Sequence, residues 1–255
     1  NQTAMPVGTC VMTCKLFSLR SANRIFTRFI VSLHKKKKKK TKMAVKYLNI
    51  SEADFLRNKR IQKFLSLERA LQLLENKKLW FSNPAKWPDP FERRFIDGEY
   101  DGGKPFTWHN RVYCMCITPN ATSEASWKAY SENDFAVKLE FARREYVDIL
   151  NRACGQPGVM DVFFGTMDYQ QTRDIEKPLS KIKFSDGAKL SISSKLFKAR
   201  LLLLKRKAFA YESEYRAIIV KKDTSNAAGI SVDIPNILSL VQSITIGPTV
   251  GDEEY

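Results

Sequence analysis

The chain has 255 residues, of which 43 are Lys or Arg and 27 are Asp or Glu, so its formal net charge is +16. Because 44% of the residues are apolar and 16 are Phe, the chain can bury a sizeable core, which excludes a wholly disordered protein. No uninterrupted apolar run approaches the roughly 20 residues that a membrane-spanning helix needs, so the sequence predicts no transmembrane segment.

The positive charge is concentrated at the start of the chain. Residues 1–43 hold 11 of the basic residues and no acidic one, which leaves 32 basic and 27 acidic residues, a net charge of +5, in residues 44–255. A body of this size and balance predicts one domain. Its charge is also only a weak indication of nucleic-acid binding.

Three interpretations of residues 1–43 stay open. Arg20, Arg24 and Arg28 recur every four residues among apolar ones, which is typical of a membrane-surface helix or a transit peptide. The six lysines of 35–40 repel one another and also suit a nucleic-acid-binding arm. The third interpretation is that an adenine-rich stretch before a start codon at Met43 has been translated. We therefore expect a basic N-terminal extension, disordered or a start-site artefact, and a domain over 44–255.

The first predicted elements of the body are a helix over 66–78 and a strand over 79–81. Apolar residues at positions 67, 70, 71 and 74 follow helical spacing, and Ser66 is suited to cap the helix N-terminus. Residues 82–110 are rich in Pro, Gly, Asp and aromatic residues without clear periodicity. They predict a long loop, which in a compact domain is usually functional or a lid.

The remaining elements alternate between strands and helices. Helices are expected near 123–131, over 143–152 and over 195–205, and the polar stretch 174–194 gives no clear prediction. Strands are expected over 111–117, 135–141, 159–169, 208–220, 230–234 and 243–246. No regular βαβ spacing and no Gly-rich phosphate loop are present. The predicted class is a single α+β domain with a mainly antiparallel or mixed sheet and flanking helices.

Cysteine and histidine give little indication of a metal site. Cys114 and Cys116 lie two apart on a predicted strand, where they share one face as small buried side chains. His109 is the only histidine in residues 44–255, so a zinc site lacks ligands and imidazole catalysis has one candidate base. We therefore expect no metal, and the few scattered cysteines favour a reducing, cytoplasmic location.

Four sequence boxes occur in a characteristic order. They are Leu79-Trp-Phe-Ser-Asn-Pro-Ala-Lys-Trp-Pro-Asp-Pro-Phe-Glu92, Ala125-Ser-Trp-Lys-Ala-Tyr130, Lys205-Arg-Lys-Ala-Phe-Ala-Tyr-Glu-Ser-Glu-Tyr-Arg216 and Ile244-Thr-Ile-Gly-Pro248. Together they resemble the bacterial family catalogued as domain of unknown function 2971, whose pattern runs Asn-Asp-Pro-Phe-Glu, Trp-x-x-Tyr and Tyr-Glu-x-Glu-Tyr-Arg. The resemblance covers about Tyr47 to the C-terminus and brings no established activity.

This chain departs from the family pattern at one position. The Asn that precedes Asp-Pro in the family is Pro88 here, so a side-chain amide is missing at that point. Members of the family usually continue beyond the Ile-Gly-Pro box, and the resemblance therefore implies a chain truncated at Tyr255.

The acidic residues of the third box have two interpretations. Glu212 and Glu214 lie two apart on the predicted strand 208–220, so their carboxylates project from one face, which Arg216 continues. The simpler interpretation is a ladder of ion pairs on a sheet surface. The functional one is a polar site with Glu212, Glu214 and Arg216 as catalytic residues and, as ligand-binding residues, Asp89, Glu92, Trp127, Tyr130 and Tyr211.

The functional hypothesis is a site for a nucleotide- or phosphate-containing ligand. Its sharpest form is ADP-ribosyl transfer with NAD as substrate, in which Glu214 holds a ribose hydroxyl and Glu212 orients the nucleophile. A metal-dependent nuclease is less favoured, because Pro88-Asp89 is followed by no Glu-x-Lys. In the non-enzymatic alternative, a ligand- or nucleic-acid-binding module, Trp80, Trp87, Trp127 and Phe91 are core residues. Whether the protein is an enzyme, its substrate and its oligomeric state stay open.

Overall fold

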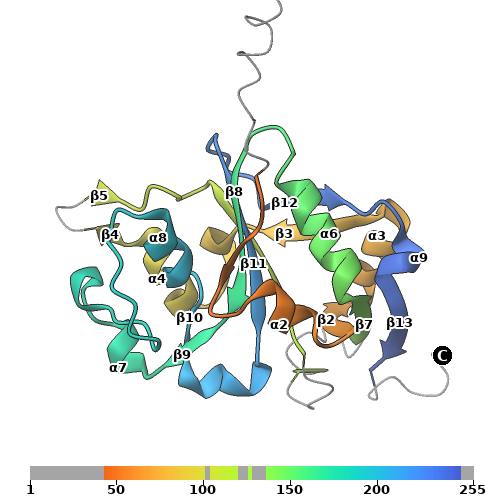
Figure 1. Ribbon diagram of the computed structural model, residues 1–255, viewed down its shortest axis with the longest axis horizontal. Coiled ribbons are helices and arrows are strands. Elements are labelled where there is room, and N and C mark those ends of the chain that lie inside the picture. The colour runs from red at the N-terminus through yellow and green to blue at the C-terminus, as the bar shows by residue number, and fades with distance from the viewer. Residues whose placement is uncertain (1–42, 101–103, 120–125, 128–135, 248–255) are drawn as a thin grey trace, which may run out of the picture. The chain divides into compact units, whose positions relative to one another are not determined.

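The computed structural model describes residues 43–100, 104–119, 126–127 and 136–247, and residues 43–255 form one compact unit (Figure 1). Helices and strands are intermingled along the chain, and the two larger sheets are mixed and antiparallel. The predicted α+β class is therefore confirmed. No helix among the described residues is both long enough and apolar enough to cross a membrane.

The main sheet has six strands, and its middle is buried on both faces. Its order is β1 (Lys46–Leu48), β8 (Val159–Thr166), β11 (Tyr215–Lys221), β6 (Val112–Ile117), β3 (Lys78–Ser82) and β12 (Gly229–Asp233). β1 is parallel to β8, and the other pairs are antiparallel. Along β11, Ala217 and Ile219 enter one hydrophobic cluster while Ile218 and Val220 enter another, which explains its uninterrupted apolar run.

A second, antiparallel sheet lies beside the first. Its order is β13 (Val241–Ile246), β7 (Ala136–Ala142) and β2 (Arg60–Ser66). The two sheets are linked where Gln62 of β2 exchanges two backbone hydrogen bonds with Thr118, just after β6. Two short sheets complete the fold: β9 (Asp168–Gln170) with β10 (Leu204–Arg206), and β4 (Glu99–Tyr100) with β5 (Lys104–Pro105).

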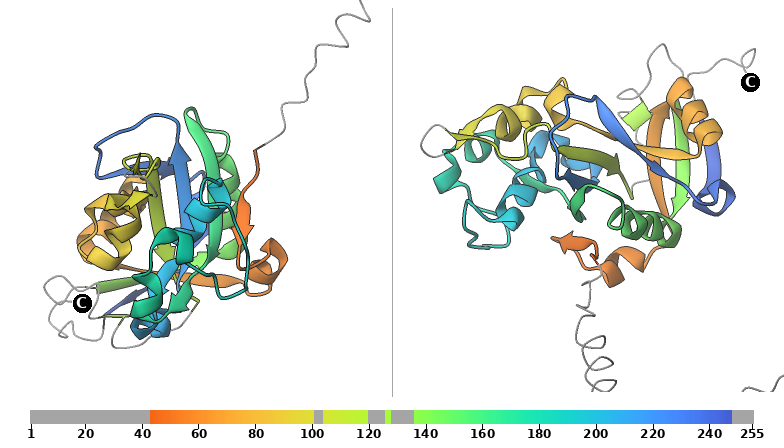
Figure 2. Two further views of the ribbon diagram at one scale, coloured as in Figure 1. Left: turned by 90° about the vertical axis from the view of Figure 1, so that its left-hand side faces the viewer. Right: turned by 90° about the horizontal axis from the view of Figure 1, so that it is seen from above.

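The helices divide between the two faces of the main sheet (Figures 1 and 2). On the face toward the second sheet lie α2 (Glu52–Leu56), α3 (Leu67–Asn76), α6 (Arg143–Ala153) and α9 (Ile237–Leu240). On the other face lie α4 (Pro90–Asp97), α7 (Thr172–Ile175) and α8 (Lys195–Leu201). The described residues also include the short 3₁₀ helices η1 (Pro84–Lys86), η2 (Leu179–Lys181) and η3 (Lys207–Glu212).

Several predicted elements are confirmed. α3 begins directly after Ser66, whose hydroxyl accepts a hydrogen bond from the Arg69 N–H, and it ends at Lys77 in the left-handed conformation. Strands predicted over 79–81, 111–117, 135–141, 230–234 and 243–246 correspond to β3, β6, β7, β12 and β13 within about two residues, and the helix over 143–152 is α6. The helix predicted near 123–131 lies mostly outside the described residues.

Three other predictions were wrong because each predicted element corresponds to two elements in the structure. The predicted strand 208–220 is the 3₁₀ turn η3 followed by β11, since Ser213 takes a left-handed conformation with φ 46° that interrupts an extended chain. The predicted helix 195–205 stops at Leu201, and β10 follows it. The predicted strand 159–169 divides into β8 and β9.

The loop predicted over 82–110 contains the helix α4. Asp89 caps this helix, and Pro90 occupies its first position, where a missing N–H costs nothing. The expectation that all four large aromatics are core residues was also wrong for Trp80, which is 50% exposed on β3 and lies against Gly229.

Gly165 approaches β1 closely inside the main sheet, and we expect Gly165→Ala to destabilise the fold. A Cβ there would lie 2.4 Å from the Leu48 carbonyl oxygen and 2.8 Å from Leu203 Cδ1, so β1 and the Leu203 side chain would have to move. Overpacking of this kind costs about 1–3 kcal/mol, measurable by urea unfolding. Gly155→Ala is the control, because its Cβ would meet only the Arg152 carbonyl at 3.5 Å. Equal stability of the two variants would contradict the tight contact.

Candidate functional site

The site is built around Lys205, on the short strand β10. Its ammonium contacts three carboxylates, Glu92 at 3.2 Å, Glu212 at 2.5 Å and Glu214 at 2.8 Å. Only 10% of the Lys205 side chain is exposed, so these ion pairs are largely shielded from water. The helix α4 therefore meets β10 and the η3–β11 junction, more than 100 residues further along the chain, at one cation.

Arg216 is the second cation of the site. Its Nε lies 2.9 Å from Glu214 Oε1, a second guanidinium nitrogen lies 3.3 Å from Glu92 Oε1, and Nη1 donates to the Leu202 carbonyl at 2.7 Å. The guanidinium also lies over the Trp87 ring, 4.6 Å from its centroid. Because Arg216 is almost fully buried, these contacts replace the water that the charge would otherwise need.

The N-terminus of α4 is attached to β10 by a neighbouring ion pair. Asp89 accepts the Phe91 N–H at 2.8 Å as the helix cap, and its other oxygen lies 2.9 Å from a guanidinium nitrogen of Arg206. The Arg206 guanidinium in turn covers the Phe91 ring at 4.2 Å. This attachment places Glu92, in the first turn of α4, against Lys205, where a negative charge is favourable next to a helix N-terminus.

The left-handed turn at Ser213 brings Glu212 and Glu214 to the same cation. Thr118 Oγ1 donates to the Glu212 carbonyl at 2.6 Å, and the Glu214 N–H donates to the Tyr169 hydroxyl oxygen at 2.9 Å, which holds both ends of the turn. The two carboxylates do converge, but through this turn and not through the predicted alternation along a strand. The interpretation as a surface ladder was also wrong, because Glu214 and Arg216 are buried.

The two glutamates of the turn differ in their electrostatics. Burial raises the pKa of Glu214, but the charges of Arg216 and Lys205 and a hydrogen bond from the Cys116 thiol outweigh it, so its pKa is lowered to about 2. For Glu212, burial outweighs the attraction of Lys205, and the nearby charges of Glu214 and Glu92 add to it, so its pKa is raised. Glu214 is therefore a permanent anion, while Glu212 is the carboxylate of the pair that is poised to take up a proton.

The cations of the site stay charged. Burial lowers the pKa of Lys205, but Glu214 and Glu92 outweigh this effect, and its pKa is raised overall. Burial lowers the pKa of Arg216, but the charges of Glu214 and Glu92 together outweigh it, and this pKa is raised as well. Burial and the Glu214 charge raise the pKa of the Cys116 thiol to about 12, so this cysteine is no thiolate nucleophile at neutral pH.

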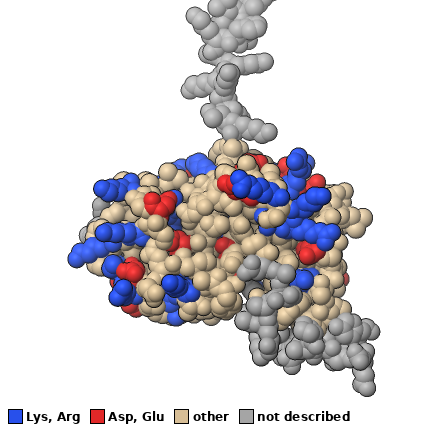
Figure 3. Space-filling model, turned by 60° about the horizontal axis from the view of Figure 1, so that its bottom comes forward, with Lys and Arg blue, Asp and Glu red and all other residues tan. Residues whose placement is uncertain are grey.

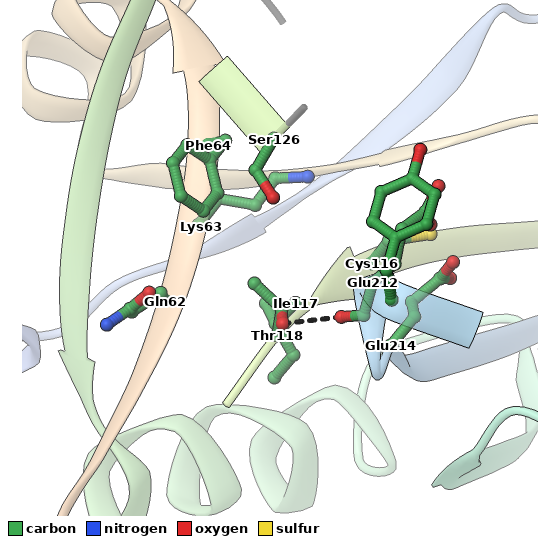
Figure 4. Close-up of a pocket in the computed structure, with 10 residues that line it drawn as sticks. Gln62, Lys63, Phe64, Cys116, Ile117, Thr118, Ser126, Glu212 and Glu214 are labelled. Carbon is green, nitrogen blue, oxygen red and sulfur yellow. Dashed lines mark hydrogen bonds between the residues drawn. The ribbon is translucent and has the colours of Figure 1, made fainter. Parts of the chain in front are cut away.

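A pocket opens beside this cluster, at the seam between the two sheets (Figure 4). It contains about 420 Å³ of empty space, part of which is open solvent. β2 provides one wall, and the end of β6 and the η3–β11 turn provide the other. The lining residues are Gln62, Lys63, Phe64, Cys116, Ile117, Thr118, Ser126, Tyr211, Glu212 and Glu214.

Most of the predicted site residues meet at this cluster and pocket. Glu92, Glu212, Glu214 and Arg216 surround Lys205, and Asp89 joins them through Arg206. Tyr211 lines the pocket and is 46% exposed. Their roles in binding or catalysis stay predictions.

Trp127 lies behind the pocket wall and is not among the residues that line the pocket. Trp127 is buried and packs edge-on against Phe64, 5.0 Å between ring centroids, so it supports the wall from behind. Tyr130 lies outside the described residues.

Sequence reasoning missed the wall contributed by β2. The pattern of 60–66 did not predict a strand, and its pairing with Thr118 joins segments more than 50 residues apart. Lys63 of this strand faces the pocket, and burial lowers its pKa. The segment Arg60-Ile-Gln-Lys-Phe-Leu-Ser66 has no clear apolar alternation, so no local signal indicated this wall.

The described residues contain no cluster of three or more His, Cys, Asp or Glu side chains placed to hold a metal ion. The three converging glutamates instead share the Lys205 ammonium. On the face in Figure 3, basic and acidic side chains of the described part are interspersed rather than gathered into one stripe.

Comparisons with known proteins leave the family open. No family model, no curated protein and no solved structure matches this chain. The resemblance to domain of unknown function 2971 therefore stays a prediction.

Proposed function

We propose that the pocket beside Lys205 binds the ribose part of a nucleotide and that Glu212 contacts its hydroxyl groups. The observation that carries the proposal is the unequal pair of carboxylates at the pocket wall. Glu214 is fixed by Lys205 and Arg216, while Glu212 has a raised pKa and remains 24% exposed. A carboxylate accepts hydrogen bonds from sugar hydroxyls, and hydroxyl-bearing Thr118, Ser126 and Tyr211 line the same pocket.

The geometry favours Glu212 for both of the roles that the sequence divided between the two glutamates. Both oxygens of Glu214 already accept charged hydrogen bonds, Oε1 from Arg216 and Oε2 from Lys205, and its side chain is 5% exposed. Glu214 is therefore a positioning residue that fixes Lys205. Glu212 keeps one oxygen on Lys205 and has the other for a ligand.

The most specific enzymatic version of this proposal is the transfer of ADP-ribose from NAD. The bond between ribose C1′ and the nicotinamide nitrogen breaks with its electron pair leaving on nicotinamide, and a hydroxyl or amine nucleophile forms the new bond at C1′. Glu212 takes the proton that the nucleophile loses, and Glu214 adds a fixed negative charge near the oxocarbenium-like transition state. A raised carboxylate pKa, closer to neutral pH, makes this proton transfer more effective.

The predicted alternative without catalysis uses the same pocket. A ligand-binding module would hold the nucleotide through Glu212 and Lys63 and release it unchanged. Titration of the protein with NAD, followed by analysis for free nicotinamide, separates the two versions. Binding without nicotinamide release supports the module.

Glu212→Gln tests the proposal directly. We expect NAD turnover to fall about 10²- to 10⁴-fold, because a neutral amide cannot accept the proton. The free energy of unfolding should stay within about 1 kcal/mol of wild type, since the lost contact with Lys205 offsets the relief of burying a charge. Nicotinamide release and urea unfolding are the measurements.

Glu176→Gln is the matched control, because Glu176 is exposed at the end of α7 and outside the pocket. It should leave turnover and stability unchanged. Wild-type protein that neither binds nor consumes NAD would contradict the proposed function.

A further inference from the structure

Lys63 occupies a position of β2 where the neighbouring side chains are apolar. Alternate residues of a strand share one face, so Lys63 lies in one row with Ile61 and Leu65. The register of β2 with β7 places Leu139 directly opposite Lys63. These three neighbours belong to the large hydrophobic cluster or pack against it. A charged side chain therefore interrupts an apolar face of the second sheet.

The Lys63 side chain reaches from this row into the pocket. It is one of the lining residues, and Figure 4 shows its ammonium directed away from β2, toward the side where Cys116 and Glu212 lie. Burial lowers the pKa of Lys63 and outweighs the attraction of the Glu214 charge. The charged form is thus less favourable here than in water, and an anion that enters the pocket beside Lys63 stabilises it.

The two walls of the pocket differ in charge, which orients a ligand. The buried cluster on the side of Glu212 holds three carboxylates against the two cations Lys205 and Arg216, a net charge of −1 when all are ionised. Among the described residues that line the pocket, Lys63 is the one cation. The acidic cluster repels a phosphate and Lys63 attracts it. A ligand that carries hydroxyl groups and a phosphate therefore presents the hydroxyl groups to Glu212 and the phosphate to β2.

We propose that Lys63 binds the phosphate of a phosphorylated riboside whose sugar is held at Glu212. A lysine ammonium donates charge-assisted hydrogen bonds to phosphate oxygens, and the Ser126 hydroxyl in the same lining is a further donor. This role rests on the proposed function, since it describes the other end of the same ligand. It narrows the ligand class, because a nucleotide with a phosphate on its ribose binds in preference to the corresponding nucleoside. Lys63 is thus a specificity-determining residue.

Two pairs of ligands that differ only by a phosphate test the role of Lys63. AMP is compared with adenosine, and nicotinamide mononucleotide with nicotinamide riboside, by calorimetry at pH 7. We expect the wild type to bind the phosphorylated member of at least one pair about tenfold more tightly, because hydrogen bonds between charged groups are roughly twice as strong as neutral ones. The pair that shows the difference identifies which riboside the pocket accepts.

Lys63→Met should remove this preference and leave the affinity for the nucleoside unchanged. Methionine preserves the length of the side chain and suits the apolar row, but it carries no charge for the phosphate. Lys63→Arg keeps the charge and should retain most of the preference. Lys78→Met is the matched control, because Lys78 is a strand lysine on β3 whose side chain is 50% exposed and outside the pocket, and it should bind as the wild type does.

The outcomes separate the two proposals. If the wild type binds both members of each pair equally, or Lys63→Met keeps the preference, the role of Lys63 is refuted while the ribose site stands. A folded Lys63→Met variant that loses the nucleoside as well would show that Lys63 supports the pocket and does not select the phosphate. If Lys63→Met does not fold, a Lys63→Arg variant that binds the nucleoside without preferring the nucleotide refutes the role. If the wild type binds none of the four ligands, the proposed function is refuted and the role of Lys63 with it.

Discussion

Lys205→Met is expected to destabilise the protein by about 4 kcal/mol at pH 7, the largest effect of any single substitution in the site. Methionine preserves the length of the side chain but removes the charge shared by Glu92, Glu212 and Glu214. Three carboxylates would then face one another around an apolar group, with Arg216 as the remaining buried cation. Urea unfolding at pH 7 and pH 5 measures the loss, which should shrink at pH 5 as Glu212 is protonated.

Lys177→Met provides the control for this prediction. Lys177 also pairs with a carboxylate, Asp174 at 2.6 Å, but its side chain is 46% exposed. A surface pair of this kind contributes less than about 1 kcal/mol. If both variants lost the same small amount, the buried cluster around Lys205 would not contribute to stability as inferred.

Glu214→Gln should produce the second largest effect, with a distinctive dependence on pH. The folded-state pKa of Glu214 is about 2, below its ordinary value of 4.5, so the ionised form stabilises the fold. This stabilisation is fully present above about pH 4.5, declines as the pH falls toward 2 and is absent below that value. At pH 7 the glutamine variant should therefore lose about 3 kcal/mol.

The measurement is urea unfolding of wild type and variant between pH 7 and pH 2.5, provided that both remain folded without urea. The two curves should converge on the acidic side as wild-type Glu214 approaches protonation. Asp174→Asn is the control, because the pKa of Asp174 is lowered too, by its hydrogen bond to Lys177, but its side chain is 34% exposed. A pH-independent difference for Glu214→Gln would show that packing, not charge, holds the residue in place.

The same charged residues stabilise the fold at this site and shape the proposed ligand pocket. Lys205 and Arg216 join α4, β10 and the η3–β11 turn, and in doing so they hold Glu214 as an anion. The arrangement leaves Glu212 partly exposed with a raised pKa. A pocket whose walls are fixed in this way needs little rearrangement when a ligand enters.

Local patterns were sufficient for much of the secondary structure. The helix over 67–76 followed from its apolar spacing and its Ser66 cap, and β7 from strict alternation of apolar and polar residues. The missed helix α4 had a local signal as well, an Asp-Pro pair at its cap and first position. The 3₁₀ turn before β11 had none, because a left-handed serine is set by the contacts of its neighbours.

The sequence alone determined the fold class, most element positions and the acidic and basic residues that make up the cluster, because periodicity, capping and charge act within a few residues. Only the tertiary structure decided that Lys205 lies at the centre, that Glu214 is buried and Glu212 is not, and that Gln62 and Lys63 complete the pocket. These features depend on β2 lying beside β6 and on α4 lying beside β10. Such contacts join distant segments, and their energies depend on burial, which no local pattern specifies.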